Sequence, residues 1–219
     1  MLDYIICSHC QNPNTVDSIK SLIRALNTEV DKALHYAERH KQFKSRINSI
    51  IKQMICSMDV DVQSTNEDFK NWINELLVFN KITSNPDYEI IDMEYSLPNG
   101  KSLDYKLRSK PTNDYLYIEV CTIQNMNPAD HEKDETINDY LNNRIKKKYE
   151  SKISNLDSIH SEGIVHFYIL PIVEYKKGME KFTFKVDKNI AFTPLTICKN
   201  GENECLLMPL NDFLKNEKQ

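Results

Sequence analysis

The sequence predicts an α/β (α+β) fold in which helices accompany a β-sheet and a long helical segment comes first. Three observations lead to this fold class. Apolar residues recur with helical spacing over residues 19–55. Three runs with strand-like alternation follow within residues 88–123, separated by turn signals. A second helical pattern over 136–156 then precedes an apolar run typical of a buried strand, 164–173.

Residues 1–60 are expected to form an irregular lead followed by a long helix or a helical hairpin. The apolar positions are three or four residues apart up to Leu34 and resume at Phe43. The interruption near His40 leaves both one very long helix and a bent hairpin open. The second half is basic, which fits either contact with a phosphate backbone or a solvated charged face.

Residues 61–219 are expected to form one core with additional strands at its C-terminal end. Ser64 and Glu67 have the spacing of a capping box, so a helix is expected to begin there. Its apolar stripe consists of Phe69, Trp72, Ile73, Leu76 and Leu77. Glu75 lies at the edge of this stripe.

Three strands are expected next, at 88–95, 101–108 and 115–123. Pro98-Asn99-Gly100 is a strong turn signal between the first two, and a polar segment beginning with Pro111 precedes the third. The helix over 136–156 should bury one stripe: Ile137, Leu141, Ile145, Tyr149 and Ile153. The later strands are expected at 164–173, 182–186, 191–198 and 205–208, with a hairpin at Asn200-Gly201 and a short C-terminal helix.

Asp104 and Glu119 occupy the polar phase of the second and third strands. Successive side chains of a strand point to opposite faces, so neighbouring strands could bring both carboxylates to one side of the sheet. A single acid on a strand is usually solvated. Glu119, however, interrupts a long apolar run, and a buried carboxylate needs a partner or a metal. Paired carboxylates suit Mg²⁺, which prefers oxygen ligands.

This order of elements, with acids on the second and third strands, resembles the core of the PD-(D/E)XK nucleases over residues 64–173. The resemblance implies a restriction-endonuclease-like core with a central mixed β-sheet flanked by helices. It also implies that Asp104 and Glu119 bind Mg²⁺ or Mn²⁺. An acid on the first helix of such cores often assists, and Glu75 is the best-placed candidate, with Glu67 as the alternative.

The family's motif lysine should follow two residues after Glu119, where this chain has Cys121, which cannot replace a cation. Either another lysine serves or the site is inactive. The helix over 136–156 offers Arg144, Lys146, Lys147, Lys148 and Lys152. Lys148 and Lys152 are one turn apart beside the apolar stripe, so either could reach the sheet, and Lys148 is our first choice. Lys106, on the strand face of Asp104, is another option.

Composition argues against several other classes of protein. The 219 residues are 40% hydrophobic and 27% charged, with a formal net charge of −4, so any contact with nucleic acid needs a local basic surface. No apolar run approaches the roughly 20 residues of a membrane span, and no secretory signal is recognisable. The six scattered cysteines are therefore expected to be reduced thiols in a cytoplasm. The four glycines form no phosphate-binding loop.

Cys7 and Cys10 have the spacing of a zinc knuckle, but structural Zn²⁺ would need a second pair of ligands. Cys198 and Cys205 are the available pair, and their spacing is loose. We therefore expect Cys7 and Cys10 to be free thiols.

The sequence thus predicts a metal-dependent nuclease acting on phosphodiester bonds, with DNA as the expected substrate. The resemblance implies a restriction- or defence-like role and makes a homodimer plausible by analogy. An alternative is a catalytically inactive module on the same fold that binds nucleic acid or a protein partner, which Cys121 favours. A third hypothesis is an interaction protein whose long N-terminal helix makes the main contacts.

Overall fold

A computed structural model describes residues 27–57, 67–123, 129, 133–153, 167–175, 185 and 196–199. Two compact units make up the chain, Met1–Lys81 and Ile82–Gln219. Several predicted features lie outside the described residues. They are the strand at 205–208, nearly all of the strand at 182–186, the hairpin at Asn200-Gly201, the C-terminal helix, the Ser64 cap and the Cys7/Cys10 pair.

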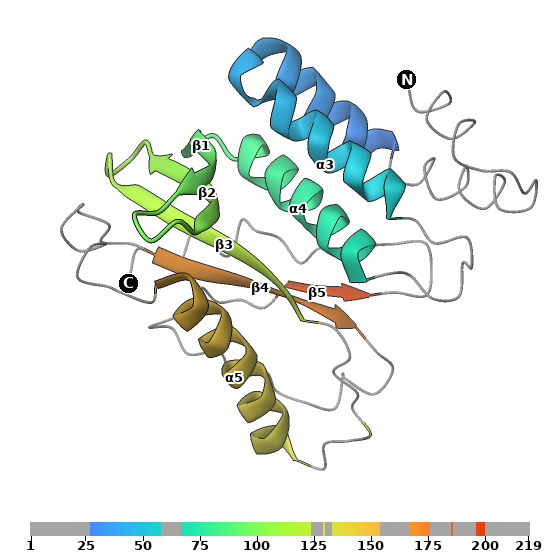
Figure 1. Cartoon of the computed structure of the whole chain (residues 1–219), viewed down its shortest axis with the longest axis vertical. Helices are drawn as coiled ribbons and strands as arrows, with labels where there is room; N and C mark the ends of the chain where they lie inside the picture. The colour runs from blue at the N-terminus through green and yellow to red at the C-terminus, as the bar shows by residue number, and fades with distance from the viewer. Residues whose placement is uncertain are drawn as a thin grey trace, which may run out of the picture. The chain divides into compact units, whose positions relative to one another are not determined.

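The described residues of the first unit form helices. A helix over residues 27–39 ends at His40, and a short 3-10 turn, η1 (Lys41–Phe43), leads into α3 (Lys44–Cys56). The backbone of His40 has left the helical conformation, with φ −120° and ψ 74°. Figure 1 shows the two helices folded back on each other at this point. The bend therefore falls where the apolar pattern is interrupted.

Helix α4 (Glu67–Ser84) belongs to this unit as far as Lys81. The apolar stripes of the helices are buried: Val30, Ala33, Ala37, Phe43, Ile47, Ile50, Met54, Phe69, Leu76 and Phe79. Polar contacts join the helices as well. The Asn80 side-chain amide donates to the Glu29 backbone carbonyl at 2.7 Å and to its carboxylate at 2.9 Å.

The second unit contains a mixed five-stranded sheet in the order β1-β2-β3-β4-β5. Its strands are β1 (Tyr88–Ser96), β2 (Ser102–Ser109), β3 (Tyr115–Ile123), β4 (Phe167–Tyr175) and β5 (Thr196–Lys199). The first three are antiparallel neighbours, whereas β4 pairs with β3, and β5 with β4, in parallel. The α/β (α+β) class is confirmed at this level, with a mixed sheet and helices.

The turn between β1 and β2 forms where Pro98-Asn99-Gly100 predicted it. Gly100 has a φ of +78°, which glycine adopts without strain, and its N–H donates to the Leu97 carbonyl at 3.0 Å. The Leu97 N–H in turn donates to the Lys101 carbonyl at 2.7 Å. The turn thus connects β1 to β2, which in turn pairs with β3.

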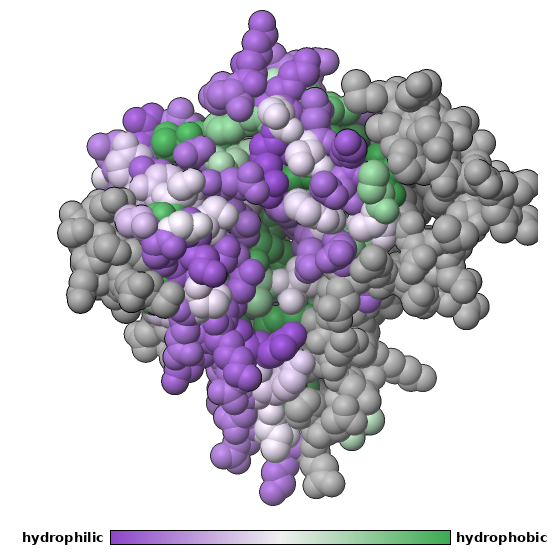
Figure 2. All heavy atoms as spheres, in the orientation of Figure 1, coloured by the Kyte–Doolittle hydropathy of each residue, from purple (hydrophilic) through white to green (hydrophobic). Residues whose placement is uncertain are grey.

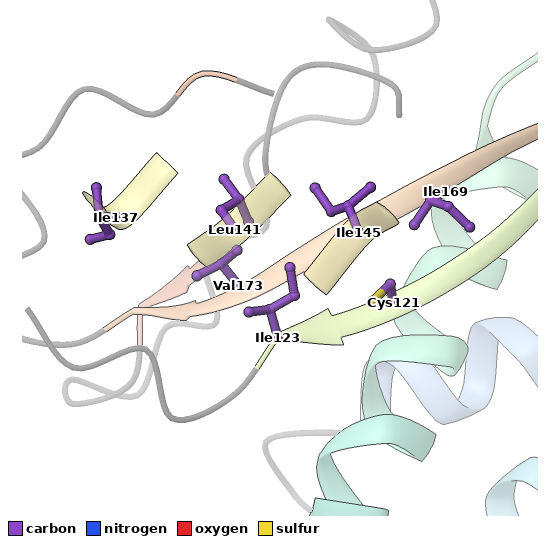
Figure 3. Packing of buried hydrophobic residues seen from close by; sticks show 7 residues of the cluster. All are labelled: Cys121, Ile123, Ile137, Leu141, Ile145, Ile169 and Val173. Carbon is purple, nitrogen blue, oxygen red and sulfur yellow. The ribbon is translucent and has the colours of Figure 1, made fainter. Parts of the chain in front are cut away.

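Helix α5 (Asp134–Ile153) connects β3 to β4 and packs on both strands. Ile137, Leu141 and Ile145 of its predicted stripe are completely buried, and Figure 3 shows them against side chains of β3 and β4. The exposed positions of α5 are polar or charged, in keeping with the hydrophilic surface in Figure 2. None of the helices in the described parts of the chain combines the length and apolar character needed to cross a membrane.

Candidate functional site

The register of β2 and β3 places Asp104 and Glu119 on the same face of the sheet. The ladder pairs Lys106 with Tyr117, and residues opposite each other in an antiparallel pair point to the same side. Asp104 and Glu119 each lie two residues beyond this pair along their own strand. Because the side-chain period of a strand is two, both belong to that same face.

Asp104 connects the two strands beyond the last residue pair of their ladder, Tyr105 with Ile118. Its Oδ2 atom accepts a hydrogen bond of 2.7 Å from the backbone N–H of Val120. The half-buried carboxylate thus takes the place of a main-chain acceptor. This hydrogen bond fixes Asp104 directly beside the backbone of Glu119.

Glu119 is buried, with only 2% of the residue exposed. Its Oε1 atom accepts from the ammonium groups of Lys148 at 2.8 Å and Lys152 at 2.9 Å. The two lysines are one turn apart on α5, so the helix directs both at one oxygen. The other oxygen, Oε2, is buried and has no hydrogen-bond partner among the described residues. One oxygen of this carboxylate is therefore held by two cations, whereas the other is buried without such a partner.

Lys152 also fixes the end of α5 to the β1–β2 hairpin. Its ammonium group donates to the Ser102 carbonyl at 2.6 Å, and its own carbonyl accepts from the Asn99 side chain at 2.8 Å. Lys148 has no such additional bond to the backbone of the sheet among the contacts of the described residues. Its side chain is also more exposed, 36% against 18% for Lys152. Lys148 is therefore the lysine better able to turn toward a ligand.

Lys148 is a stable cation. Burial lowers the pKa of its ammonium group. The charge and hydrogen bond of Glu119, with a smaller contribution from Asp104, raise this pKa by more than burial lowers it. The pKa therefore lies above its usual value, and Lys148 stays protonated at neutral pH. It can donate hydrogen bonds and neutralise negative charge, but it cannot serve as a general base there.

Cys121, two residues after Glu119, belongs to the apolar core. It packs with Ile123 and Ile145 in the cluster drawn in Figure 3. Burial raises the pKa of its thiol to about 11, with the negative charges of Glu119 and Asp104 adding to the effect. A thiol of this kind remains neutral at physiological pH, so Cys121 is neither a cation nor a nucleophilic thiolate.

The other predicted residues have different surroundings. The ammonium group of Lys106 lies over the rings of Tyr95, Tyr115 and Tyr117. Glu75, in the first unit, accepts from Arg46 at 2.7 Å. Its assisting role in catalysis stays a prediction, and the side chain of Glu67 lies outside the described residues.

Sequence reasoning missed the tyrosines around Lys106. Tyr115 and Tyr117 alternate along β3 in phase with Glu119, so the strand pattern already placed them on the face of the carboxylates. Their gathering around one lysine depends on the register with β2, which no local pattern specifies.

A Mg²⁺ or Mn²⁺ ion at these carboxylates would be held by few protein ligands. Within the described parts of the chain, no three His, Cys, Asp or Glu side chains gather closely enough to hold a metal. Mg²⁺ retains several waters, however, and two carboxylates suffice for it. Among the described residues, no group supplies the Oε2 atom of Glu119 with the partner that a buried carboxylate oxygen needs. Asp104 on the same face would supply the second carboxylate.

Comparison of the chain with models of protein families, with curated proteins and with solved structures gives no significant match.

Proposed function

We propose that this chain is a Mg²⁺- or Mn²⁺-dependent nuclease of the PD-(D/E)XK kind that hydrolyses phosphodiester bonds in DNA. The observation that carries the proposal is the state of Glu119. One of its oxygens binds two lysines, while the other is buried and has no hydrogen-bond partner within the described parts of the chain. Both lie on the sheet face that also bears Asp104. The element order supports the same proposal, because the acids lie on the second and third strands and a crossover helix follows.

Each of these residues has a chemical role in hydrolysis. When bound, the metal ion would lower the pKa of a coordinated water and neutralise charge on the phosphate. Asp104 and Glu119 would hold the ion, and the Val120 N–H keeps Asp104 oriented before any ligand arrives. Lys148 would donate hydrogen bonds to the attacking water or to a phosphate oxygen, where charge develops in the transition state. This cation comes from α5, which compensates for Cys121 on β3.

The test is calorimetric titration of Mn²⁺ into the wild type and Asp104→Asn, with plasmid cleavage measured in parallel. We expect Mn²⁺ binding and metal-dependent nicking in the wild type and the loss of both in Asp104→Asn. Asp114→Asn is the matched control, because Asp114 is an exposed acid in the turn before β3. Equal Mn²⁺ binding by the wild type and Asp104→Asn would contradict the proposal.

A second candidate function is a catalytically inactive module on the same fold that binds nucleic acid or a protein partner. Cys121 is the observation that favours it, because the motif position carries a neutral thiol. This function predicts that Asp104→Asn and Glu119→Gln retain wild-type binding of nucleic acid and that no metal supports cleavage. Metal-dependent nicking by the wild type would eliminate it.

The setting of the protein is also part of the proposal. A restriction- or defence-like role and a homodimer are proposed by analogy with nucleases of this kind. Scattered cysteines, of which Cys56 and Cys121 are free thiols in the described parts of the chain, fit a reducing cytoplasm. Light scattering of the purified chain would test the dimer directly.

A further inference from the structure

Lys106 lies among three tyrosine rings on the sheet of the second unit. Its ammonium group is 4.6 Å from the ring centroid of Tyr95, 4.9 Å from that of Tyr115 and 5.3 Å from that of Tyr117. The rings of Tyr95 and Tyr117 are themselves in contact, with centroids 5.2 Å apart and an interplanar angle of 58°. We call Lys106 and these three residues the lysine–tyrosine cluster. A cation over aromatic faces is stabilised by the ring quadrupoles.

The members of the cluster differ in their access to solvent. Tyr117 is buried and Tyr95 half-buried, so these two rings hold Lys106 in place from within the protein. Tyr115 is 45% exposed and, together with Ile91, is one of the large hydrophobic side chains left exposed in the described parts of the chain. Lys106 is also partly exposed. An accessible ring therefore lies beside an accessible cation, the combination that binds a base together with its phosphate.

The cluster lies next to the candidate metal site. Lys106 is opposite Tyr117 in the ladder, and each is two residues from a carboxylate, Asp104 on β2 and Glu119 on β3. With a rise of about 3.4 Å per residue, two residues along a strand span roughly 7 Å. This distance is comparable with the separation of neighbouring phosphates in an extended strand of nucleic acid. A strand with one phosphate at the carboxylates would therefore bring the next nucleotide to the cluster.

We propose that Tyr115 and Lys106 form a subsite for single-stranded nucleic acid, in which the Tyr115 ring stacks on a base and Lys106 binds a phosphate. The exposed Tyr115 ring favours single-stranded over duplex nucleic acid. In a duplex both faces of each base are covered by its neighbours, whereas an unpaired base can stack on an exposed aromatic side chain. The inference rests on the proposed function for the identity of the substrate, but binding to the subsite requires no hydrolysis.

The test measures fluorescence anisotropy of a short labelled oligothymidylate with the full chain in the presence of EDTA. Tyr115→Ala should weaken binding by about 5- to 150-fold, the usual effect of removing one stacking ring, and Tyr115→Phe should bind like the wild type. Lys106→Met should reduce the slope of log affinity against log salt by about 0.7, as expected for one lost phosphate contact. Lys110→Met is the control, because this exposed lysine is bound to the Pro86 carbonyl at 2.8 Å.

Three results would each overturn the subsite. The first is undetectable binding of oligothymidylate by the wild type, and the second is wild-type affinity in Tyr115→Ala. The third is that Tyr115→Ala weakens binding of a duplex of matched length as much as it weakens binding of the single strand. Oligonucleotide binding in EDTA separates this inference from the proposed function, because such binding requires neither a metal ion nor hydrolysis. If Asp104→Asn retains Mn²⁺ binding while Tyr115→Ala loses oligonucleotide binding, the hydrolytic function fails and the subsite stands.

Discussion

The ammonium group of Lys148 on α5 lies 2.8 Å from the Oε1 atom of Glu119 on β3. The helix that follows β3 thus supplies a cation to this strand, on which the next residue on the same face, Cys121, is neutral. Lys152 approaches the same oxygen at 2.9 Å, so the carboxylate and the two ammonium groups form a three-charge cluster. This cluster can contribute both to the stability of the fold and to catalysis.

Replacing both lysines by methionine should strongly destabilise the fold. Lys148→Met together with Lys152→Met leaves the buried Glu119 carboxylate without a cation, and breaking a buried ion pair in this way costs about 3–5 kcal/mol. Adding Glu119→Met should recover most of the loss, because an apolar side chain needs no partner there. Urea denaturation measures the free energy of unfolding of each variant.

The control for this series is Lys146→Met. Lys146 is exposed on the same helix and lies 3.9 Å from Glu150, a surface pair whose loss should change stability by less than about 1 kcal/mol. If the double lysine variant were as stable as Lys146→Met, the charge cluster would not contribute to stability.

Lys148→Met should lower the rate of DNA cleavage by about 100- to 1000-fold while Mn²⁺ binding is retained. This is the usual effect of removing one donor that stabilises charge in a transition state. Because the pKa of Lys148 is raised, the ratio of wild-type to variant rates should stay constant between about pH 6 and pH 9. Single-turnover cleavage across this range is the measurement. A ratio that changes with pH would mean that Lys148 exchanges a proton during the reaction.

The thiol of Cys121 should be inert at neutral pH. Its pKa of about 11 lies above the ordinary 9.0, so the folded state favours the protonated form. This contribution to stability is fully present below pH 9 and is lost as the pH rises through about 11. Iodoacetamide should alkylate the exposed Cys56 much faster than Cys121 at pH 8, as peptide mass spectrometry would show. Cleavage by Cys121→Ala at the wild-type rate would agree with a thiol that takes no part in the reaction.

The catalytic role predicted for Glu75 can be tested by comparing Glu75→Gln with a variant of its ion-pair partner, Arg46. The ion pair with Arg46, whose guanidinium also lies 5.5 Å from the Trp72 ring centroid, gives Glu75 a role in the packing of the first unit. If that role is the only one, Glu75→Gln and Arg46→Met should each cost about 1–3 kcal/mol and leave cleavage by the folded protein unchanged. Loss of cleavage in Glu75→Gln alone would establish the catalytic role predicted from the resemblance. Thermal melting and plasmid nicking are the two measurements.

The elements that position the site could be predicted from local patterns. The three antiparallel strands begin and end within about one residue of the predicted bounds because turn residues such as Gly100 interrupt clear alternation. The buried stripe of α5 followed from its 3.6-residue period. The shared face of Asp104 and Glu119 followed from strand phase, once the two strands were neighbours.

The partners of these residues could not be predicted, because they depend on how elements lie across each other. Lys106, Lys148 and Lys152 were all candidates to reach the carboxylates, and only the packing of α5 on β3 directs two of them at Glu119. The pairing of Glu75 with Arg46 joins α4 to α3 across 29 residues of sequence. Sequence patterns give the face of an element, whereas tertiary packing decides which side chains meet there.

The parallel pairing of β3 with β4 has a consequence for the order in which the chain folds. The β1–β2–β3 meander contains only short connections, so its antiparallel pairing and the Asp104–Val120 hydrogen bond need little loop closure. The β3–β4 pairing needs the whole crossover through α5 and should therefore form later. Until α5 docks, the Glu119 carboxylate can remain hydrated on an uncovered strand, and docking then buries it against its two partly exposed lysines. High salt, which weakens attraction between charges, should thus slow the docking of α5 more than it slows formation of the meander.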